Sequence, residues 1–201
     1  METSLRDATT LFVVIDPIGQ IPLFLALTRN ATDSERKRIA LRCILISAII
    51  LGLFILGGQF LLGKLGISLA SFQIAGGIVL FLFGLRMIFE EEGKKEPHHL
   101  EVKQDIAVFP LAIPSIAGPG TMMAVVLATD RTRFGWVEQI GTTLILLVIL
   151  GITYVFLRLA APIQRLIGNT GANVISRVLG LILASLAVEK ILEGIKLFWP
   201  P

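Results

Sequence analysis

Long apolar blocks alternate with short charged islands along the 201 residues of this chain. A helix that crosses the hydrocarbon core of a bilayer needs roughly 20 predominantly apolar residues in a row. Six blocks have about that length, and they cover residues 5–28, 39–62, 68–89, 106–129, 136–160 and 172–198. The pattern predicts an all-α membrane protein of about six transmembrane helices.

One strongly polar stretch, residues 90–105, divides the chain close to its middle. It carries charges of both signs together with Gly93 and Pro97, a composition typical of a linker. We therefore expect a first three-helix repeat in residues 1–89, a polar cytoplasmic linker in 90–105 and a second three-helix repeat in 106–201.

The composition agrees with a membrane protein and indicates an orientation. Hydrophobic residues make up 54% of the chain and charged residues 16%, whereas soluble domains average roughly 45–50% and about 25%. The net charge is +3, but Lys and Arg lie between the apolar blocks, which favours cytoplasmic anchors over a nucleic-acid surface. Twelve of them follow the first, third and fifth spans and six lie on the opposite face. The positive-inside rule therefore predicts both termini outside the cytoplasm.

Two proline pairs suggest an internal repeat. Pro17 and Pro22 in the first span match Pro114 and Pro119 in the fourth, 97 residues later, and the third and sixth spans align at an offset of 104. Three spans per half force the second half to insert upside down, and such inverted repeats are common in secondary transporters. The alternative is chance similarity, because apolar sequences draw on few residue types.

The same prolines should break the first and fourth helices. Each removes an N–H group and crowds the carbonyl four residues earlier, and the freed polar groups cannot face lipid. The following half-helices should begin near Leu23 and Thr121, with unpaired amides that suit a carboxylate, while opposing carbonyls suit an ammonium or a cation. A structural kink with no ligand is the alternative.

These breaks define the predicted site. We expect substrate-binding roles for Asp16, Pro17, Gly19, Pro22, Pro114, Gly118, Pro119, Gly120 and Thr121. Asp16 lies well inside an apolar block, where an ionised carboxylate is costly, so it should face the bundle interior and bind a proton, a sodium ion or a substrate amine. Alternatively, it caps the second half-helix or pairs with a basic residue.

Other polar residues have simpler interpretations. Glu189, Lys190 and Glu193 should pair locally near an interface, while Gln73 and Ser185 should form interhelical hydrogen bonds. Small residues spaced four apart favour close helix packing. Those pairs are Ala48 and Gly52, Ser71 and Ala75, and Gly180 and Ala184.

Nothing in the chain points to an enzyme. Both histidines, His98 and His99, lie in the polar stretch, and motifs of zinc proteases, serine hydrolases and P-loop proteins are absent from the sequence. The single cysteine, Cys43, excludes an internal disulfide and a cysteine-based metal cluster. We expect no catalytic activity, no metal and no cofactor.

Two motifs resemble the signatures of the MarC-like integral membrane proteins. The first runs from Asp16 through Pro17, Gly19 and Pro22, and the second runs from Pro110 to Thr121 and includes an Ala-Gly-Pro-Gly-Thr sequence. Asp16 departs from the pattern, because many relatives are expected to have Asn there. The resemblance implies six spans, an inner-membrane location and kinship with LysE-type amino acid exporters, with small neutral amino acids as substrates.

Three functional hypotheses follow. The first is a secondary transporter of small solutes, with small neutral amino acids as the substrate class and a proton or sodium ion as the coupling ion. The second is a non-transporting membrane protein that binds a partner under stress, for which 90–105 would be the docking loop. The third is drug efflux, which the low aromatic content of 7% disfavours. Substrate identity, direction of transport and oligomeric state stay open.

Overall fold

The computed structural model describes residues 2–89, 105–130 and 134–199, and every regular element in these ranges is helical. In chain order the elements are α1 (Glu2–Ile15), α2 (Gln20–Leu27), α3 (Asp33–Lys64), α4 (Leu69–Phe89), η1 (Ala107–Ile116), α5 (Pro119–Ala128), α6 (Trp136–Arg158) and α7 (Ala160–Phe198). The all-α prediction is confirmed. The predicted linker and both histidines lie outside the described residues, apart from Asp105.

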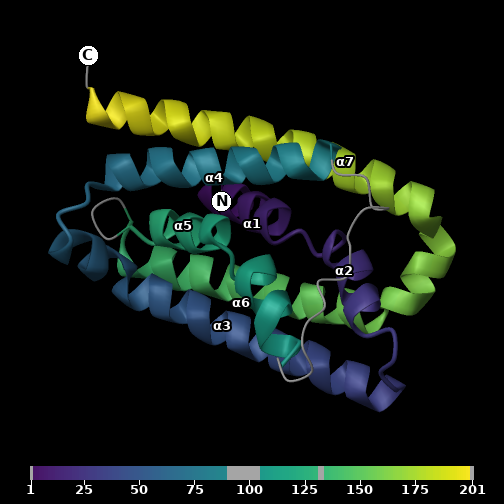
Figure 1. Ribbon diagram of the computed structural model, residues 1–201. Coiled ribbons are helices and arrows are strands. Elements are labelled where there is room, and N and C mark those ends of the chain that lie inside the picture. The colour runs from purple at the N-terminus through teal and green to yellow at the C-terminus, as the bar shows by residue number, and fades with distance from the viewer. Residues whose placement is uncertain (1, 90–104, 131–133, 200–201) are drawn as a thin grey trace.

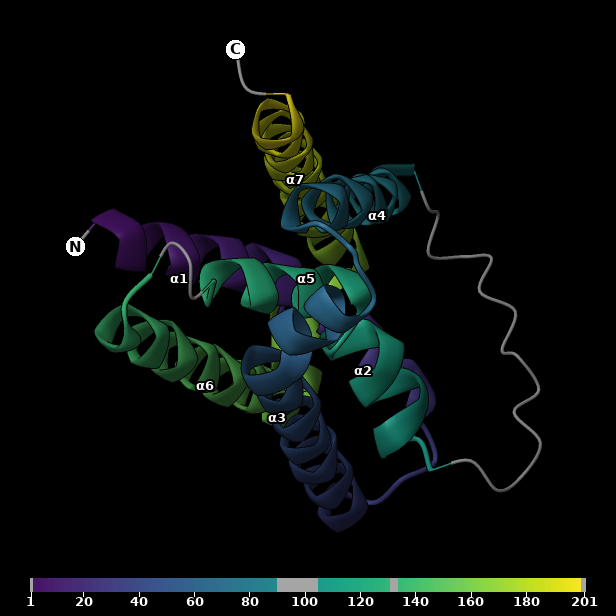
Figure 2. The same cartoon turned by 90° about the vertical axis from the view of Figure 1, so that its left-hand side faces the viewer.

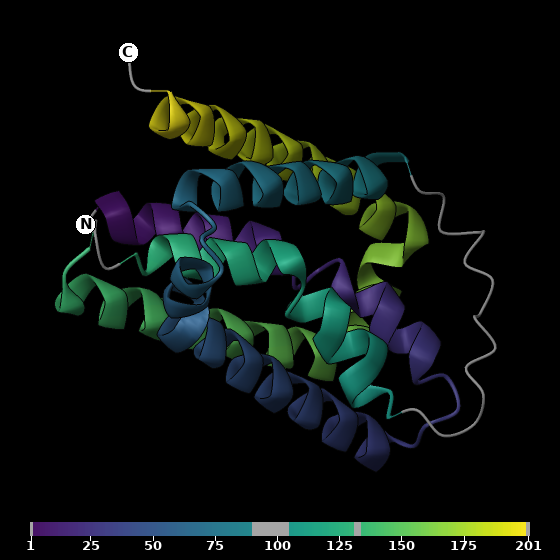
Figure 3. The same ribbon diagram turned by 60° about the vertical axis from the view of Figure 1, so that its left-hand side comes forward.

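The helices form three layers (Figure 1). The long helices α4 and α7 lie side by side in one layer, α1 and α5 lie in the middle, and α3 and α6 form the third layer. Figure 2 shows the same order after a quarter turn, with α1 and α5 between the outer pairs. The start of α1 and the end of α7 lie at the same end of the bundle (Figure 3), as the prediction of six crossings requires.

Helix α3 shows how the sequence fixes a span. Thr32 and Glu35 form a capping box at its start, which satisfies amides that have no partner within the helix. The helix is about 48 Å long at roughly 1.5 Å per residue, so its charged first turns extend beyond a hydrocarbon core of about 30 Å. Large apolar side chains then form an exposed stripe, namely Leu41, Leu45, Ile49, Leu53, Leu56 and Phe60. Such a stripe is suited to lipid.

Length and composition identify the membrane spans. Four stretches in the described residues are long and apolar enough to cross a bilayer, and they are Asp7–Leu27, Asp33–Lys64, Leu69–Phe89 and Trp136–Arg158. The pair η1 and α5, bent by 54°, makes a fifth when it is counted as one broken span. The sixth predicted span, 172–198, lies within α7, which does not meet the same criterion, so the exact count of six stays a prediction.

The contact between α4 and α7 is built on small residues with a spacing of seven. Ala70, Gly77 and Gly84 on α4 face Gly194, Ala187 and Gly180 on the antiparallel α7. A Cβ atom added to Gly84 would lie 2.8 Å from both the Ala184 nitrogen and the Gly180 oxygen, so the two backbones are in direct contact there. The predicted packing role of Gly180 and Ala184 is therefore confirmed.

The other packing predictions are wrong, except that Ala48 packs against the buried core. Nothing lies within 4 Å of a Cβ atom added to Gly52, and Ser71 and Ala75 are exposed, because these positions are on outward faces of α3 and α4. Ser185 is also exposed and donates to the Leu181 carbonyl of its own helix rather than to a neighbour. Gln73, by contrast, is buried and donates across the α4–α7 contact, as predicted.

Gly168 changes the direction of the chain within α7. Helix α7 contains a sharp bend at Gly168, whose φ of 69° is left-handed and easily adopted only by glycine. The segment after the bend corresponds to the predicted sixth span. Near the far end of this segment Lys190 and Glu193 form an ion pair at 2.9 Å, which confirms the predicted local pairing.

Candidate functional site

The first helix is interrupted between Ile15 and Gln20, as the sequence predicts. Asp16 has a left-handed backbone with φ of 49°, a conformation that Asp tolerates better than most residues because its side chain can bond locally. Its Oδ1 atom accepts the Gly19 amide at 3.0 Å. Asp16 therefore bonds to the residue that precedes α2, while no side chain caps the start of α2 itself. No basic side chain pairs with Asp16 within the described ranges.

Gly19 makes this hydrogen bond sterically feasible. A Cβ atom at Gly19 would lie 1.9 Å from Asp16 Oδ2, so any larger residue would push the carboxylate away. Helix α2 then begins at Gln20, three residues before the predicted start at Leu23. The difference arises because Pro22 lies in the first turn of α2, where its missing N–H group costs nothing.

The second break lies between η1 and α5. Phe109 and Ile113 have extended backbones, and each precedes a proline, whose ring disfavours a helical conformation at the preceding residue. Gly118 is extended and Pro119 opens α5, two residues before the predicted start at Thr121. No side chain caps this start, so the first amides of α5 have no side-chain acceptor, and their predicted role toward a ligand stays a prediction.

The two breaks meet in the interior through Gln20 and Ser115, which are 95 residues apart in sequence. Gln20 Nε2 donates to the Ile15 carbonyl at 3.2 Å and to the Ser115 carbonyl at 3.3 Å. Ser115 Oγ donates in return to Gln20 Oε1 at 2.6 Å. One side chain therefore satisfies a carbonyl freed by each break, and the breaks are closed against each other in this conformation.

The predicted site residues divide by exposure. Asp16, Pro17, Gly118, Gly120 and Thr121 are buried, and Gly19 and Pro22 are half-buried. Pro114 and Pro119 are exposed, so their effect is to interrupt the backbone rather than to line an interior space.

Sequence reasoning missed Gln20 and Ser115, although both stand inside the proline motifs. The available signal was an uncharged polar side chain next to each break in an otherwise apolar stretch. Their pairing itself depends on the docking of the two halves.

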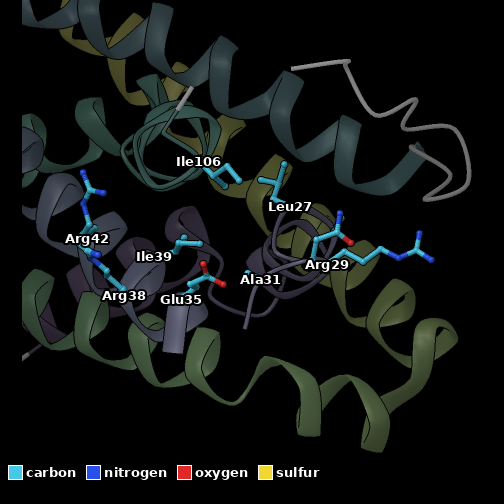
Figure 4. Close-up of a pocket in the computed structure, with 10 residues that line it drawn as sticks. Leu27, Arg29, Ala31, Glu35, Arg38, Ile39, Arg42 and Ile106 are labelled. Atoms are coloured by element: carbon cyan, nitrogen blue, oxygen red, sulfur yellow. The ribbon is translucent and has the colours of Figure 1, made fainter. Parts of the chain in front are cut away.

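Two cavities lie away from this junction. The first, with a volume of about 580 Å³, lies between α2, the start of α3 and η1 (Figure 4). The second, of about 500 Å³, is an apolar groove between α1 and α6 that includes Phe12 and Val148. None of the predicted site residues lines either cavity. In the described ranges no cluster of His, Cys, Asp and Glu has the arrangement of a metal site.

Comparison with known proteins gives a consistent result. Residues 1–199 match the family described as "MarC family integral membrane protein". The chain is 36% identical to the UPF0056 membrane protein YvbG of Bacillus subtilis, over 95% of this chain and 93% of the relative. It is 30% identical to the UPF0056 inner membrane protein YhgN of Escherichia coli, over 98% of each chain.

An archaeal relative extends the range of the similarity. The UPF0056 membrane protein of Methanocaldococcus jannaschii is 35% identical, over 94% of this chain and 93% of the relative. No solved structure matches the chain. These matches cover both proline motifs and nearly every helix described above, and the chain belongs to the MarC family of integral membrane proteins.

Proposed function

We propose that this protein is a multi-pass secondary transporter of small solutes, with small neutral amino acids as the substrate class and no catalytic activity. The observation that carries the proposal is the direct contact between two interrupted helices, one from each half of the chain, through Gln20 and Ser115. Broken helices in corresponding positions of two halves are the arrangement in which transporters place their substrate sites.

The contacts between helices support an inverted repeat. If α1, α2, α3 and α4 are exchanged with η1, α5, α6 and α7, the contact of α3 with η1 becomes that of α6 with α1. Likewise, the contact of α4 with α5 becomes that of α7 with α2. The contact of α3 with α5 becomes that of α6 with α2. The α4–α7 and α3–α6 contacts map onto themselves. Such pairing is what a twofold relation between the halves requires.

The Gln20 amide indicates which ligand groups the junction can accept. Its –NH₂ group occupies two carbonyl oxygens, as a substrate ammonium would, and its oxygen accepts from a hydroxyl, as a substrate carboxylate would. A zwitterionic amino acid offers both groups in one small molecule. The breaks are closed against each other in this conformation, so the proposal requires a second conformation in which Gln20 and Ser115 separate.

Two further groups complete the proposed site. The uncapped start of α5 at Gly120 and Thr121 presents amides and a partial positive charge, which favour a carboxylate. The Asp16 carboxylate, only 4% exposed, would hold the substrate amine or a coupling proton or sodium ion. The full set of substrate-contacting residues is proposed as Asp16, Gly19, Gln20, Ser115, Gly120 and Thr121.

The proposal is tested by flux in proteoliposomes. Purified protein should carry labelled alanine or glycine faster than empty vesicles, and a proton or sodium gradient should change the rate. Absence of flux under every gradient would remove the proposal. Given flux, Asp16→Asn should alter its dependence on pH or sodium, and an unchanged dependence would exclude Asp16 from coupling.

A matched pair of serine variants tests the junction. Ser115→Ala removes the hydroxyl that binds Gln20, whereas Ser185→Ala removes a hydroxyl that bonds only within α7. We expect Ser115→Ala to change the apparent affinity for substrate and Ser185→Ala to leave it unchanged. If both variants had the same apparent affinity for substrate, the substrate site would not lie at the junction.

A further inference from the structure

The cavity between α2, the start of α3 and η1 carries an excess of positive charge. We define it as the basic cavity, and its arginines are Arg29, Arg38 and Arg42. Arg38 and Arg42 come from one face of α3, and Arg29 lies across the cavity from them on the α2 side (Figure 4). Its volume of about 580 Å³ is large enough for a ligand of several polar groups.

The acidic groups near the basic cavity already have partners. Glu35, which also lines it, accepts two hydrogen bonds of 2.8 Å from Thr32 in the capping box of α3. Arg42 pairs with Asp105. Arg29 and Arg38 have no acidic partner in the part of the chain that the structure describes. Both guanidinium groups are therefore free of acidic partners, but the Arg29 side chain extends away from Arg38 (Figure 4), so a shared anion requires Arg29 to turn toward the cavity.

Apart from Asn30, the rest of the lining is apolar, and the cavity lies where the apolar stripe of α3 begins. Leu27, Ile39 and Ile106 cover the wall between the arginines (Figure 4). On α3 the exposed apolar stripe begins at Leu41, directly between Arg38 and Arg42, so these arginines mark the boundary between the aqueous phase and lipid. A polar head and a hydrocarbon chain would each meet a matching surface here.

We propose that the basic cavity binds the headgroup of an anionic phospholipid, with the phosphate held by Arg38 and by an Arg29 side chain that turns toward it, and an acyl chain along the α3 stripe. Basic pockets between helices on the cytoplasmic side of membrane proteins have this preference, and the positive-inside rule assigns this end of the bundle to the cytoplasm. Guanidinium groups suit the phosphate because they form bidentate hydrogen bonds with its oxygens. The proposal is independent of transport, since no residue of the basic cavity belongs to the junction.

Native mass spectrometry of the full chain in detergent tests this assignment. Phosphatidylglycerol and phosphatidylcholine are titrated separately, and the bound lipid is counted. The wild-type chain should retain phosphatidylglycerol in preference. Arg29→Gln with Arg38→Gln should weaken it by about 25-fold, at about fivefold per arginine, and leave phosphatidylcholine unchanged. Arg165→Gln, an exposed arginine outside the cavity, is the matched control and should have no effect.

A competition experiment and a charge-conserving variant complete the test. Excess free glycerol phosphate should not displace the lipid, because it lacks the acyl chain; full displacement would show a site for a soluble phosphate and overturn the proposal. Arg29→Lys with Arg38→Lys keeps the charge and should retain most of the preference, even if the Gln variant fails to fold. Equal retention of both lipids by the wild-type chain, or an unchanged preference in the folded Gln variant, would also overturn it.

Discussion

Gly84→Ala tests whether the close contact between α4 and α7 determines stability. The added methyl group would lie 2.8 Å from the Ala184 nitrogen and the Gly180 oxygen. Both are backbone atoms, so neither can rotate away as a flexible side chain would. The helices must separate by several tenths of an ångström, and this separation would weaken the neighbouring contacts at Gly77 as well.

The expected magnitude follows from two opposing effects. In a helix, alanine is favoured over glycine by about 0.8–1.0 kcal/mol. Overpacking a well-packed interface costs about 1–3 kcal/mol. The difference predicts that Gly84→Ala reduces the free energy of unfolding by up to about 2 kcal/mol, which corresponds to a decrease in Tm of up to roughly 8 °C for a chain of this size.

Gly151→Ala on α6 is the matched control, because nothing lies within 4 Å of a Cβ atom at Gly151. It has the same helix-propensity gain without the clash, so its Tm should be equal to or above that of the wild-type chain. Both variants are heated in detergent, and the folded fraction is measured by size exclusion. If Gly84→Ala were as stable as Gly151→Ala, the α4 and α7 helices could separate at no cost in free energy, which would contradict this reasoning.

Three other outcomes are expected. Thr32→Ala removes the side-chain half of the α3 capping box with Glu35 and should lower stability by about 1 kcal/mol, measured as a decrease in Tm; no decrease would show that this exposed helix start frays already. Gly19→Ala should lower the free energy of unfolding by about 1–3 kcal/mol, because the added methyl group forces the Asp16 carboxylate away from the Gly19 amide. A second substitution in the same chain, Asp16→Ala, removes the clash and should recover part of this loss. Cys43 is fully buried, so a maleimide reagent should label the folded chain in detergent far more slowly than the chain in denaturing SDS; equal rates would contradict the packing around α3.

The membrane spans could be predicted because each depends on a local property. Apolar blocks of sufficient length predicted α4 and α6 to within two residues at each end. The start of α3 was placed six residues too late, at 39 rather than at Asp33. Apolarity marks the hydrocarbon core, whereas this helix continues into water, where its capping box and charged first turn stabilise it.

The candidate site was predictable only in part. Proline chemistry identified both breaks from the sequence, and a local role for Asp16 at the first break was one of the stated alternatives. The contact between Gln20 and Ser115 could not be inferred, because it joins residues 95 positions apart and depends on how the two halves dock. The seven-residue spacing at Gly77 and Gly84 was missed for a related reason, since small residues reveal their partner helix only in three dimensions.

The distribution of these contacts bears on where motion can occur. Lipid solvates apolar faces, so helices in a bilayer associate through close packing and hydrogen bonds rather than through the hydrophobic effect. The α4–α7 contact extends along both helices and brings their backbones together at Gly77, Gly84 and Gly180. The junction of the breaks depends on a few hydrogen bonds of Gln20, each worth about 0.6–2 kcal/mol in a membrane. A movement that separates Gln20 from Ser115 must break these hydrogen bonds and also shift the core side chains packed around both breaks, such as Ile15 and Ile116. Under the proposed function, an entering solute would replace the hydrogen bonds, while α4 and α7 hold the two halves together.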